Sequence, residues 1–213
     1  MLEIVETPIL TRREREKIQL RQAILDATQA IAAKEGWQAV TTRKVAEKIE
    51  YSLPTLYEYF ENKAALLAEL NREGYRQLLA VLQQARKNAP TPTRAVLDGA
   101  QAYCNFAWQH RELYEVMHGL SGVVLETNSY HTEAQALTNE AQTALEDWAC
   151  AEGIQVQNAS ALNDAVQILR ALLHGLASLA LAKQIIGGKK VAAALALRAI
   201  EDQLEAWRTK KSL

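Results

Sequence analysis

The stretch Thr41–Leu67 carries the side chains whose types and spacing point to a chemistry. Its sequence is TTRKVAEKIEYSLPTLYEYFENKAALL, which predicts two short helices separated by a tight turn and followed at once by a third helix. This is helix-turn-helix geometry, in which the second helix can enter the major groove of DNA. The stretch therefore predicts DNA binding as the chemistry of this protein.

Groups that could support catalysis or hold a metal are few. The histidines fall at no metal-ligand spacing: His110, His118, His131 and His174. Glu115 and His118 lie three residues apart and could share a helix face, but a lone pair of this kind is usually structural. Cys104 and Cys150 have no CxxC partner and follow apolar helical patterns, so we expect two buried free thiols. Since a Gly-rich phosphate loop is also missing, we expect no enzymatic activity, no metal and no cofactor; a helical enzyme is the alternative.

Helices must position the DNA-binding side chains, because the chain has only 9 Gly and 4 Pro and shows no convincing strand alternation. After an N-terminal arm at residues 1–11, periodicity and capping residues predict helices at Arg13–Lys34, Arg43–Ile49, Leu53–Tyr59, Lys63–Lys87, Thr93–His110, Glu112–Leu120, His131–Glu152, Ser160–Ile186 and Lys189–Lys210. The segment Asn88–Pro92 is the clearest break, and Ser121–Tyr130 is a connector. The predicted fold class is all-α, with a three-helix DNA-binding head in residues 1–66 and a helical regulatory domain in residues 67–213.

Composition is that of an ordinary soluble globular protein, with 49% hydrophobic and 23% charged residues and a net charge of -1. Residues 1–66 contain ten basic and ten acidic side chains, so a positive DNA-facing surface must come from the sorting of charges between faces. The N-terminus lacks a signal-peptide core, and no run reaches the roughly 18 apolar residues of a membrane span. We expect a cytoplasmic protein with no membrane partner.

Caps and apolar positions define the predicted head in more detail. Thr41 or Thr42 would cap its first short helix, Ser52 the second, and Asn62 the long helix that follows. Pro54 would lie in a first turn, where its missing N–H costs nothing. The residues expected to face inward are Val45, Ala46, Ile49, Leu56 and Phe60.

This segment resembles the DNA-binding head of the TetR family of bacterial repressors. The shared pattern is a Thr-capped helix with Ala inside it, a turn, then Thr-Leu-Tyr, an aromatic pair, and a Lys before a long helix. The rest of the chain resembles the family in architecture. In addition, LLHGLASLALA at Leu172–Ala182 is similar to a Trp/Leu-x-x-His-Gly-Leu helix in one (WHG-like) subgroup of the family's C-terminal domains.

The resemblance implies a role for each DNA-binding candidate. Phosphate contacts, and a base-edge contact where the arginine reaches one, are implied for Thr42 and Arg43. Base contacts at the start of the recognition helix are implied for Leu53, Pro54 and Thr55. Phosphate contacts are implied for the hydroxyls of Tyr57 and Tyr59, and for Lys63 at the N-terminus of the long helix. The alternative for the whole motif is ordinary packing of three short helices.

Two positions depart from the family pattern. Glu50 stands where the family usually has Gly, and a non-Gly residue at positive φ costs on the order of 1 kcal/mol. Tyr51 replaces a small aliphatic residue. The basic segment Thr11–Lys17 could reach the minor groove, as family arms sometimes do, or could be a solvated helix start.

Bulky and aromatic side chains of the second half cluster between Tyr103 and His118 and around Trp148 with Cys150. Helical bundles bind small molecules in such apolar surroundings, and the resemblance implies an inducer pocket here; core packing is the alternative. The candidate ligand-binding residues are Tyr103, Phe106, Trp108, Met117, His118, Trp148 and His174.

The last two predicted helices are rich in small residues, among them Gly175, Ala177, Ala180, Ala193, Ala194 and Ala196. This composition suits a homodimer built as a four-helix bundle through these helices, as the resemblance also implies. Two heads one DNA turn apart would read a near-palindromic operator. The expected function is a ligand-responsive transcriptional repressor that a small-molecule inducer releases from double-stranded DNA. The alternative is a helical ligand- or partner-binding protein without sequence-specific DNA binding.

Overall fold

The computed structural model describes residues 11–120, 122 and 131–213. Within them, helix is the regular structure, apart from one β-bridge between Gln155 and Ser212. This confirms the all-α prediction. The elements in chain order are α1 (Arg12–Glu35), a short 3₁₀ helix η1 (Trp37–Ala39), α2 (Thr42–Lys48), α3 (Leu53–Tyr57), α4 (Lys63–Asn88), α5 (Pro92–Gln109), α6 (Arg111–Met117), α7 (His131–Glu152), α8 (Ala159–Leu181) and α9 (Gly188–Lys210).

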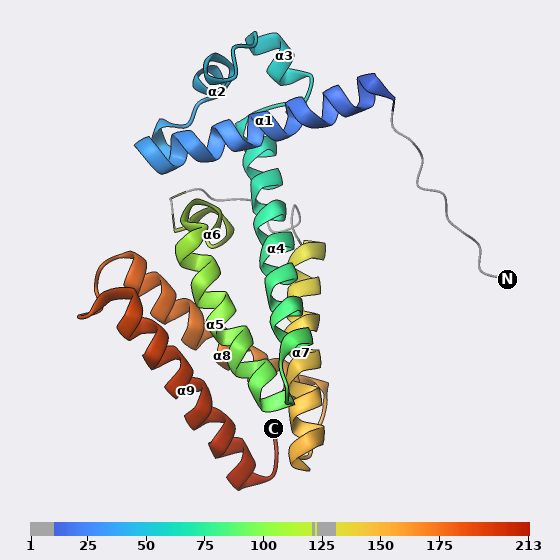
Figure 1. The fold of residues 1–213 in the computed structure, drawn as a ribbon, viewed down its shortest axis with the longest axis vertical. Helices are drawn as coiled ribbons and strands as arrows, with labels where there is room; N and C mark the ends of the chain where they lie inside the picture. Colours follow the sequence, from blue (N-terminus) through green and yellow to red (C-terminus); the bar gives the residue numbers. More distant parts are fainter. Residues whose placement is uncertain (1–10, 121, 123–130) are drawn as a thin grey trace, which may run out of the picture.

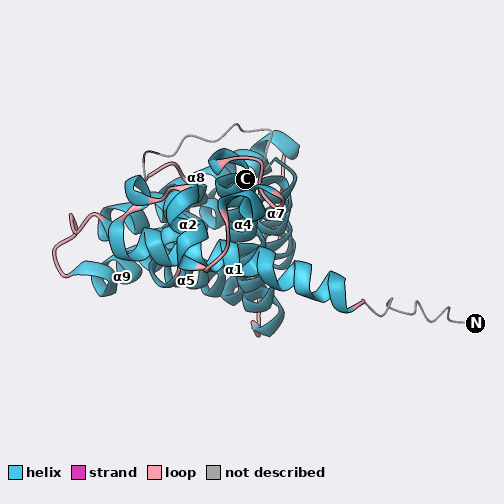
Figure 2. Cartoon of the chain, turned by 90° about the horizontal axis from the view of Figure 1, so that it is seen from above, coloured by secondary structure: helices cyan, strands magenta, loops and turns pink. Residues whose placement is uncertain are grey.

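The head of the molecule consists of α1, α2 and α3, which lie together at one end (Figure 1). Helix α4 leaves this head and runs down the remaining body, packed against α5, α6 and α7. Helices α8 and α9 pack on each other and against α5. Seen from above, α1 crosses over the helices of the body and its N-terminal end projects beyond them (Figure 2). The predicted division at residue 66 falls within α4, so this helix belongs to both parts and the division remains a prediction.

Local sequence explains where the helices of the head begin. Thr11 caps α1 in a reciprocal capping box with Glu14, and the side chains of Thr41, Ser52 and Asn62 cap α2, α3 and α4. Each cap satisfies a backbone N–H that has no partner within its helix. The short helices therefore start at fixed residues, and this determines which of their side chains face outward.

Three predicted helix ends were wrong, and one of them is that of α6, which ends at Met117 instead of Leu120. Helix α8 ends at Leu181 instead of Ile186, because Lys183 adopts φ 59 and the Gln184 N–H bonds back to the Leu179 carbonyl at 2.9 Å. Helix α3 ends at Tyr57, so Tyr59 lies in the turn that follows. The predicted arm and the connector Ser121–Tyr130 lie almost entirely outside the described residues.

Helix α8 is the one described helix that is long and apolar enough to cross a membrane, judged by length and composition alone. One such helix is weak evidence, since a core helix of a soluble protein passes the same test. Its apolar sequence is interrupted by Gln167, Arg170 and His174. Its buried side chains pack against the neighbouring helices α5, α7 and α9.

The two cysteines differ in their surroundings. Cys104 on α5 is 1% exposed, as expected, but the prediction of a buried Cys150 was wrong because this residue is exposed on α7. Trp148 and Ala149 lie on the buried face of α7. Cys150 follows 100° further around the helix and points to solvent. Both cysteines are free thiols.

We expect one thiol per chain to react rapidly with Ellman's reagent in the folded protein. Burial raises the pKa of the Cys104 thiol to about 11, so this residue has little thiolate and little access. A Cys150→Ser variant should lose the rapid phase and react only on unfolding. Rapid reaction of two thiols in the native protein would contradict the position of α5 in the core.

Candidate DNA-binding head and ligand cavity

The helix-turn-helix packs through the apolar residues that the sequence pattern selected. Val45 and Ala46 of α2, Leu56 of α3 and Phe60 beyond it are buried, and Ile49 is half-buried against the same core. Ala46 leaves room for α2 and α3 to contact each other. These contacts confirm the predicted inward face of the motif.

The turn between α2 and α3 forms with a glutamate in the left-handed region. Glu50 has φ 60, which agrees with the positive φ expected where the family pattern has glycine. The Tyr51 N–H donates to the Ala46 carbonyl at 3.1 Å and the Glu50 N–H to the Glu47 carbonyl at 3.2 Å. This is a Schellman termination of α2, so the turn keeps its geometry despite the side chain.

A Glu50→Gly substitution should raise the free energy of unfolding by about 0.5 to 1 kcal/mol, because glycine adopts positive φ without steric cost. Glu58, also exposed in the head but at φ -66, is the matched control, and Glu58→Gly should destabilise by a similar amount. Urea unfolding of both variants measures the difference. Equal destabilisation by the two substitutions would show that position 50 carries no backbone strain.

The start of α2 presents Thr42 and Arg43 next to the end of α3. The Thr42 and Tyr57 hydroxyl oxygens lie 3.4 Å apart, which brings two of the predicted phosphate-binding groups together. Arg43 is exposed and its Nε donates to Glu47 at 3.0 Å. An exposed pair one helical turn apart is weak, so the guanidinium can turn toward another acceptor at little cost.

The recognition helix α3 exposes Pro54, while Leu53 and Thr55 are half-buried. Ser52 and Thr55 share a hydroxyl contact of 2.7 Å at the cap of this helix. Tyr57 is 46% exposed, whereas Tyr59 is half-buried and packs against the core.

Lys63 is the first residue of α4, whose unpaired N–H groups give this end of the helix a positive field. The predicted DNA-binding residues thus occupy the start of α2, helix α3 with the turn after it, and the start of α4. Their contacts with DNA remain predictions.

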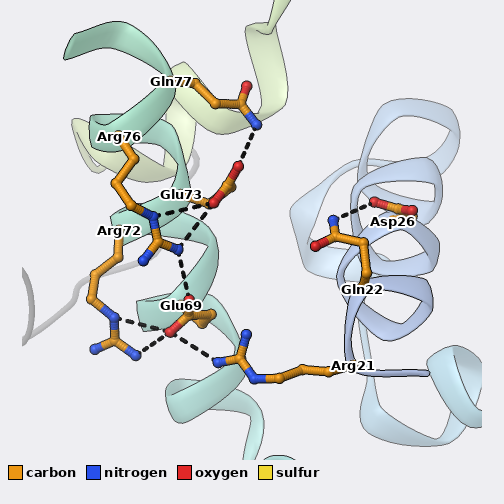
Figure 3. A network of polar contacts seen from close by, with 8 residues as sticks. All are labelled: Arg21, Gln22, Asp26, Glu69, Arg72, Glu73, Arg76 and Gln77. Atoms are coloured by element: carbon orange, nitrogen blue, oxygen red, sulfur yellow. Dashed lines mark hydrogen bonds and ion pairs between the residues drawn. The ribbon is translucent and has the colours of Figure 1, made fainter. Parts of the chain in front are cut away.

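A buried carboxylate connects the head to α4, and the sequence analysis did not identify it. Glu69 is 5% exposed and bonds to Arg21 of α1 at 3.1 Å, to Arg76 at 2.8 Å and to Arg72 (Figure 3). We call Glu69, Arg21, Arg72 and Arg76 the Glu69 cluster. The Arg21 guanidinium also lies 5.0 Å from the centre of the Phe60 ring, so one side chain holds α1 against both α4 and the helix-turn-helix.

The electrostatics of the Glu69 cluster favour the charged carboxylate. Burial by itself raises the pKa of Glu69, but hydrogen bonds from Arg72, Arg76 and Arg21 outweigh it and lower the pKa to about 2. The spacing of Glu69, Arg72 and Arg76 places them on one face of α4 and is visible in the sequence. The contribution of Arg21, from another helix, is not.

A cavity of about 830 Å³ lies in the body, within the size range of small-molecule sites. Helices α4 to α8 provide most of its walls, and Ile200 of α9 also lines it. Apolar side chains dominate the lining, including Leu82, Val96 and Leu145. Two lining residues, Arg86 and Glu140, form an ion pair with 2.6 Å between Arg86 Nε and Glu140 Oε1, and their charges neutralise each other.

A connected chain of polar groups lies at the cavity wall near α6; Tyr103 and His174 line the cavity, whereas Tyr114 and Ser178 bond to them without lining it. The Tyr114 hydroxyl lies 3.1 Å from the Tyr103 hydroxyl and 2.7 Å from His174 Nδ1, and Ser178 Oγ lies 3.4 Å from His174 Nε2. The His118 ring packs 4.5 Å from the His174 ring, centre to centre.

The two histidines at this part of the cavity wall, His118 and His174, are held in the neutral form. Burial, and then electrostatic repulsion from Arg170 and from a protonated His174, lower the pKa of His118 to about 3. The pKa of His174 is also lowered, first by burial and then by Arg170. The pKa of Tyr114 is raised to about 12 by burial. At neutral pH this part of the wall therefore offers uncharged hydrogen-bonding groups.

The structure separates the predicted ligand-binding residues into two groups. Tyr103, Met117, His118 and His174 line the cavity. Phe106, Trp108 and Trp148 are not among its lining residues: Phe106 and Trp148 are buried in the core, and Trp108 is half-buried against it. The Trp148 ring instead packs 6.2 Å from that of Trp207 on α9.

Helix α6 approaches α4 very closely beside the cavity. A Cβ at Gly74 would lie 2.5 Å from Met117 Sδ, so only glycine allows this approach with Met117 in its present position. Helix α6 also contacts α1, and its C-terminal residues Val116 and Met117 line the cavity. A group that enters the cavity would therefore touch side chains whose helices contact the head.

Among residues 11–120, 122 and 131–213, no group of three or more His, Cys, Asp or Glu side chains is arranged to hold a metal ion. Glu115, considered with His118 as a pair, instead accepts a hydrogen bond from Arg111 at 2.6 Å. His118 belongs to the cavity wall.

Comparison with known families gives two matches. Residues 24–70 match the family described as bacterial regulatory proteins, tetR family, and residues 96–202 match the tetracyclin repressor-like C-terminal domain. The first segment contains the helix-turn-helix and Glu69. The second covers most of the cavity wall.

Relatives agree with these matches. The chain is 37% identical over 87 residues to the HTH-type transcriptional repressor KstR of Mycolicibacterium smegmatis, and the aligned segment spans 41% of each protein. A Rhodococcus sp. RHA1 protein of unknown function superimposes with a TM-score of 0.76 at 20% identity, covering 97% of this chain and 100% of that one. A tetR-family regulatory protein from Rhodococcus RHA1 superimposes with a TM-score of 0.64 at 20% identity, over 84% and 95% of the two chains.

Proposed function

The chain belongs to the TetR family of bacterial regulatory proteins, and from this premise we propose that it is a cytoplasmic, ligand-responsive repressor that binds a near-palindromic DNA operator as a homodimer. The single observation that carries the proposal is the course of α4. This helix begins with Lys63 in the head, holds α1 through Glu69, and supplies Asn71, Tyr75 and Arg86 to the cavity wall. The proposed DNA-binding and ligand-binding surfaces would thus share one helix.

In this proposal α3 enters the major groove, where Leu53 and Pro54 contact thymine methyl groups and Arg43 hydrogen-bonds a base edge. Thr42, Tyr57, Tyr59 and Lys63 bind phosphates and set the register of the head. Because Tyr59 is half-buried, the proposed contact with a DNA phosphate involves only its hydroxyl group.

The cavity is the proposed inducer site. A ligand that displaces Met117 or His118 moves α6, and α6 contacts both α1 and α4. The Glu69 cluster then transmits the shift of α4 to α1 and changes the separation of the two heads. The ligand must prefer the displaced state, because equal affinity for both states would shift neither population.

Dimerisation is proposed through the exposed apolar face of α8 and α9. Ile168 and Leu179 are 43% and 44% exposed, and their spacing of eleven residues places them on one side of α8. Val191 of α9 is exposed as well. Exposed apolar residues grouped on two packed helices are typical of a partner-binding surface.

A Leu179→Asp variant should be monomeric, because dimerisation would bury an unpaired carboxylate. We expect its dimer dissociation constant to rise at least about hundredfold, by the free-energy scale of a buried charge at an interface. Light scattering coupled to size-exclusion chromatography measures the mass. Ile18→Asp on α1, where Ile18 is 55% exposed, is the control and should leave the mass unchanged. A dimeric Leu179→Asp protein would place the interface elsewhere.

The salt dependence of DNA affinity tests the proposed function against its alternative. A repressor whose heads bind phosphates through cationic groups should lose affinity steeply, with a slope of log K against log salt steeper than about -2. Fluorescence anisotropy of a labelled duplex gives this slope. Weak binding that is indifferent to salt would favour a helical ligand- or partner-binding protein without sequence-specific DNA binding.

A further inference from the structure

A polar stripe runs along the otherwise apolar helix α8. Gln167, Arg170, His174 and Ser178 are spaced by three, four and four residues, which places them on one side of the helix. The first three line the cavity. Arg170 lies about 200° around the helix from Ile168, so its side chain points away from the proposed dimer face.

The charges on the cavity wall do not balance. The charged lining residues are Arg86, Glu140 and Arg170. Arg86 is paired with Glu140 at 2.6 Å and with Asp147 at 3.3 Å. Arg170 has no ion pair or hydrogen bond in the part of the chain that the structure describes, so the described wall carries one uncompensated positive charge.

Among residues 11–120, 122 and 131–213, none forms an ion pair that would neutralise Arg170. Its neighbour along the stripe is His174, one turn away, and the His118 ring lies against that histidine at 4.5 Å. Both rings are neutral, since burial and the Arg170 charge lower their pKa values. Gln167, Arg170 and Ala171 are exposed although they line the cavity, so the cavity reaches solvent along this side of α8.

We propose that Arg170 binds the anionic group of an amphipathic ligand whose apolar body fills the cavity. The chemical class is a carboxylate or similar monoanion on a hydrocarbon body. A guanidinium presents a planar fork of donors that matches a carboxylate with two parallel hydrogen bonds. The neutral polar groups of His118 and His174 lie near this position, and Leu82, Leu145 and Ile200 are among the apolar residues that line the cavity. The inference rests on the proposed function, in which this cavity is the inducer site.

Calorimetric titration with a matched pair of probes tests this assignment. Decanoate and decan-1-ol share a chain length but differ in charge, and both are used below the concentration at which they aggregate. The wild-type protein should bind decanoate about tenfold more tightly than decan-1-ol, the scale of one charge-assisted, partly exposed contact. The preference should shrink as salt is added.

Arg170→Gln removes the charge and keeps a polar side chain at an exposed position. This variant should bind decan-1-ol as the wild type does and bind decanoate no better than the alcohol. Arg94→Gln is the matched control, because Arg94 is an exposed arginine on α5 that does not line the cavity. It should keep the wild-type preference for decanoate.

Three outcomes would overturn the inference: equal binding of the two probes by the wild type, an unchanged decanoate preference in Arg170→Gln, or no binding of either probe. None of these depends on DNA. Operator binding measured on the same preparations therefore separates a failure of the anion site from a failure of the proposed repressor function.

Discussion

Glu69→Ala is expected to lower the free energy of unfolding by about 2 to 4 kcal/mol. Removal of the Glu69 carboxylate leaves the guanidinium groups of three arginines close together without a negative charge between them. Breaking a buried charge cluster lowers the free energy of unfolding by an amount of this order. The arginines are partly exposed, which keeps the cost below that of a fully buried cluster. Urea unfolding at a fixed protomer concentration measures it, since dimerisation makes stability depend on concentration.

Glu73→Ala is the matched control on the same helix. Glu73 pairs with Arg76 at 3.0 Å but makes no bond to α1, and we expect a loss below about 1 kcal/mol. Equal losses in the two variants would mean that the link to Arg21 contributes nothing to stability.

The dependence of stability on pH follows from the same carboxylate. The pKa of Glu69 is lowered in the folded protein to about 2, from an ordinary value of 4.5. Its contribution is therefore complete above pH 4.5 and is lost as the pH falls toward 2. Glu69→Gln should flatten the stability profile over this interval, and an unchanged acid limb would contradict the lowered pKa.

The second large effect concerns DNA. Lys63→Ala should weaken binding to all duplexes by about the same factor and reduce the magnitude of the salt slope by about one for each phosphate that the head no longer binds. Arg43→Ala should instead relax the choice of base at one position, at about 1 to 3 kcal/mol. Competition binding against duplexes with single base changes distinguishes these two behaviours.

Lys87→Ala provides the control, because Lys87 is an exposed lysine at the opposite end of α4, away from the head. It should leave both the affinity and the salt slope unchanged. If Lys87→Ala weakened DNA binding as much as Lys63→Ala, the assignment of the DNA-facing end of the molecule would be wrong.

Much of the head could be predicted because its signals are local. Thr41, Ser52 and Asn62 each cap the helix that follows within three residues, and Pro54 marks a first turn. The sequence also located the departure at Glu50, where the family pattern has glycine. The turn still forms with glutamate, because its Schellman hydrogen bonds join backbone groups alone.

Features that depend on distant segments could not be predicted in the same way. Arg21 and Glu69 are far apart in sequence, and Tyr114 and His174 meet across 60 residues. Apolar periodicity selects the inward face of a helix but does not distinguish a cavity wall from a filled core, and Tyr103 and Phe106 on α5 show both outcomes. Cys150 was misplaced because a single step along α7 changes the face of a residue.

Selection from random double-stranded DNA with the purified full-length protein at moderate salt, followed by sequencing of the retained duplexes, tests the central claim most directly. The repressor model predicts an enriched near-palindrome with half-sites about one helical turn, roughly 34 Å, apart. It also predicts that Leu179→Asp loses this enrichment, since one head alone reads half of the site. Retained duplexes without a common sequence would contradict sequence-specific binding by the head.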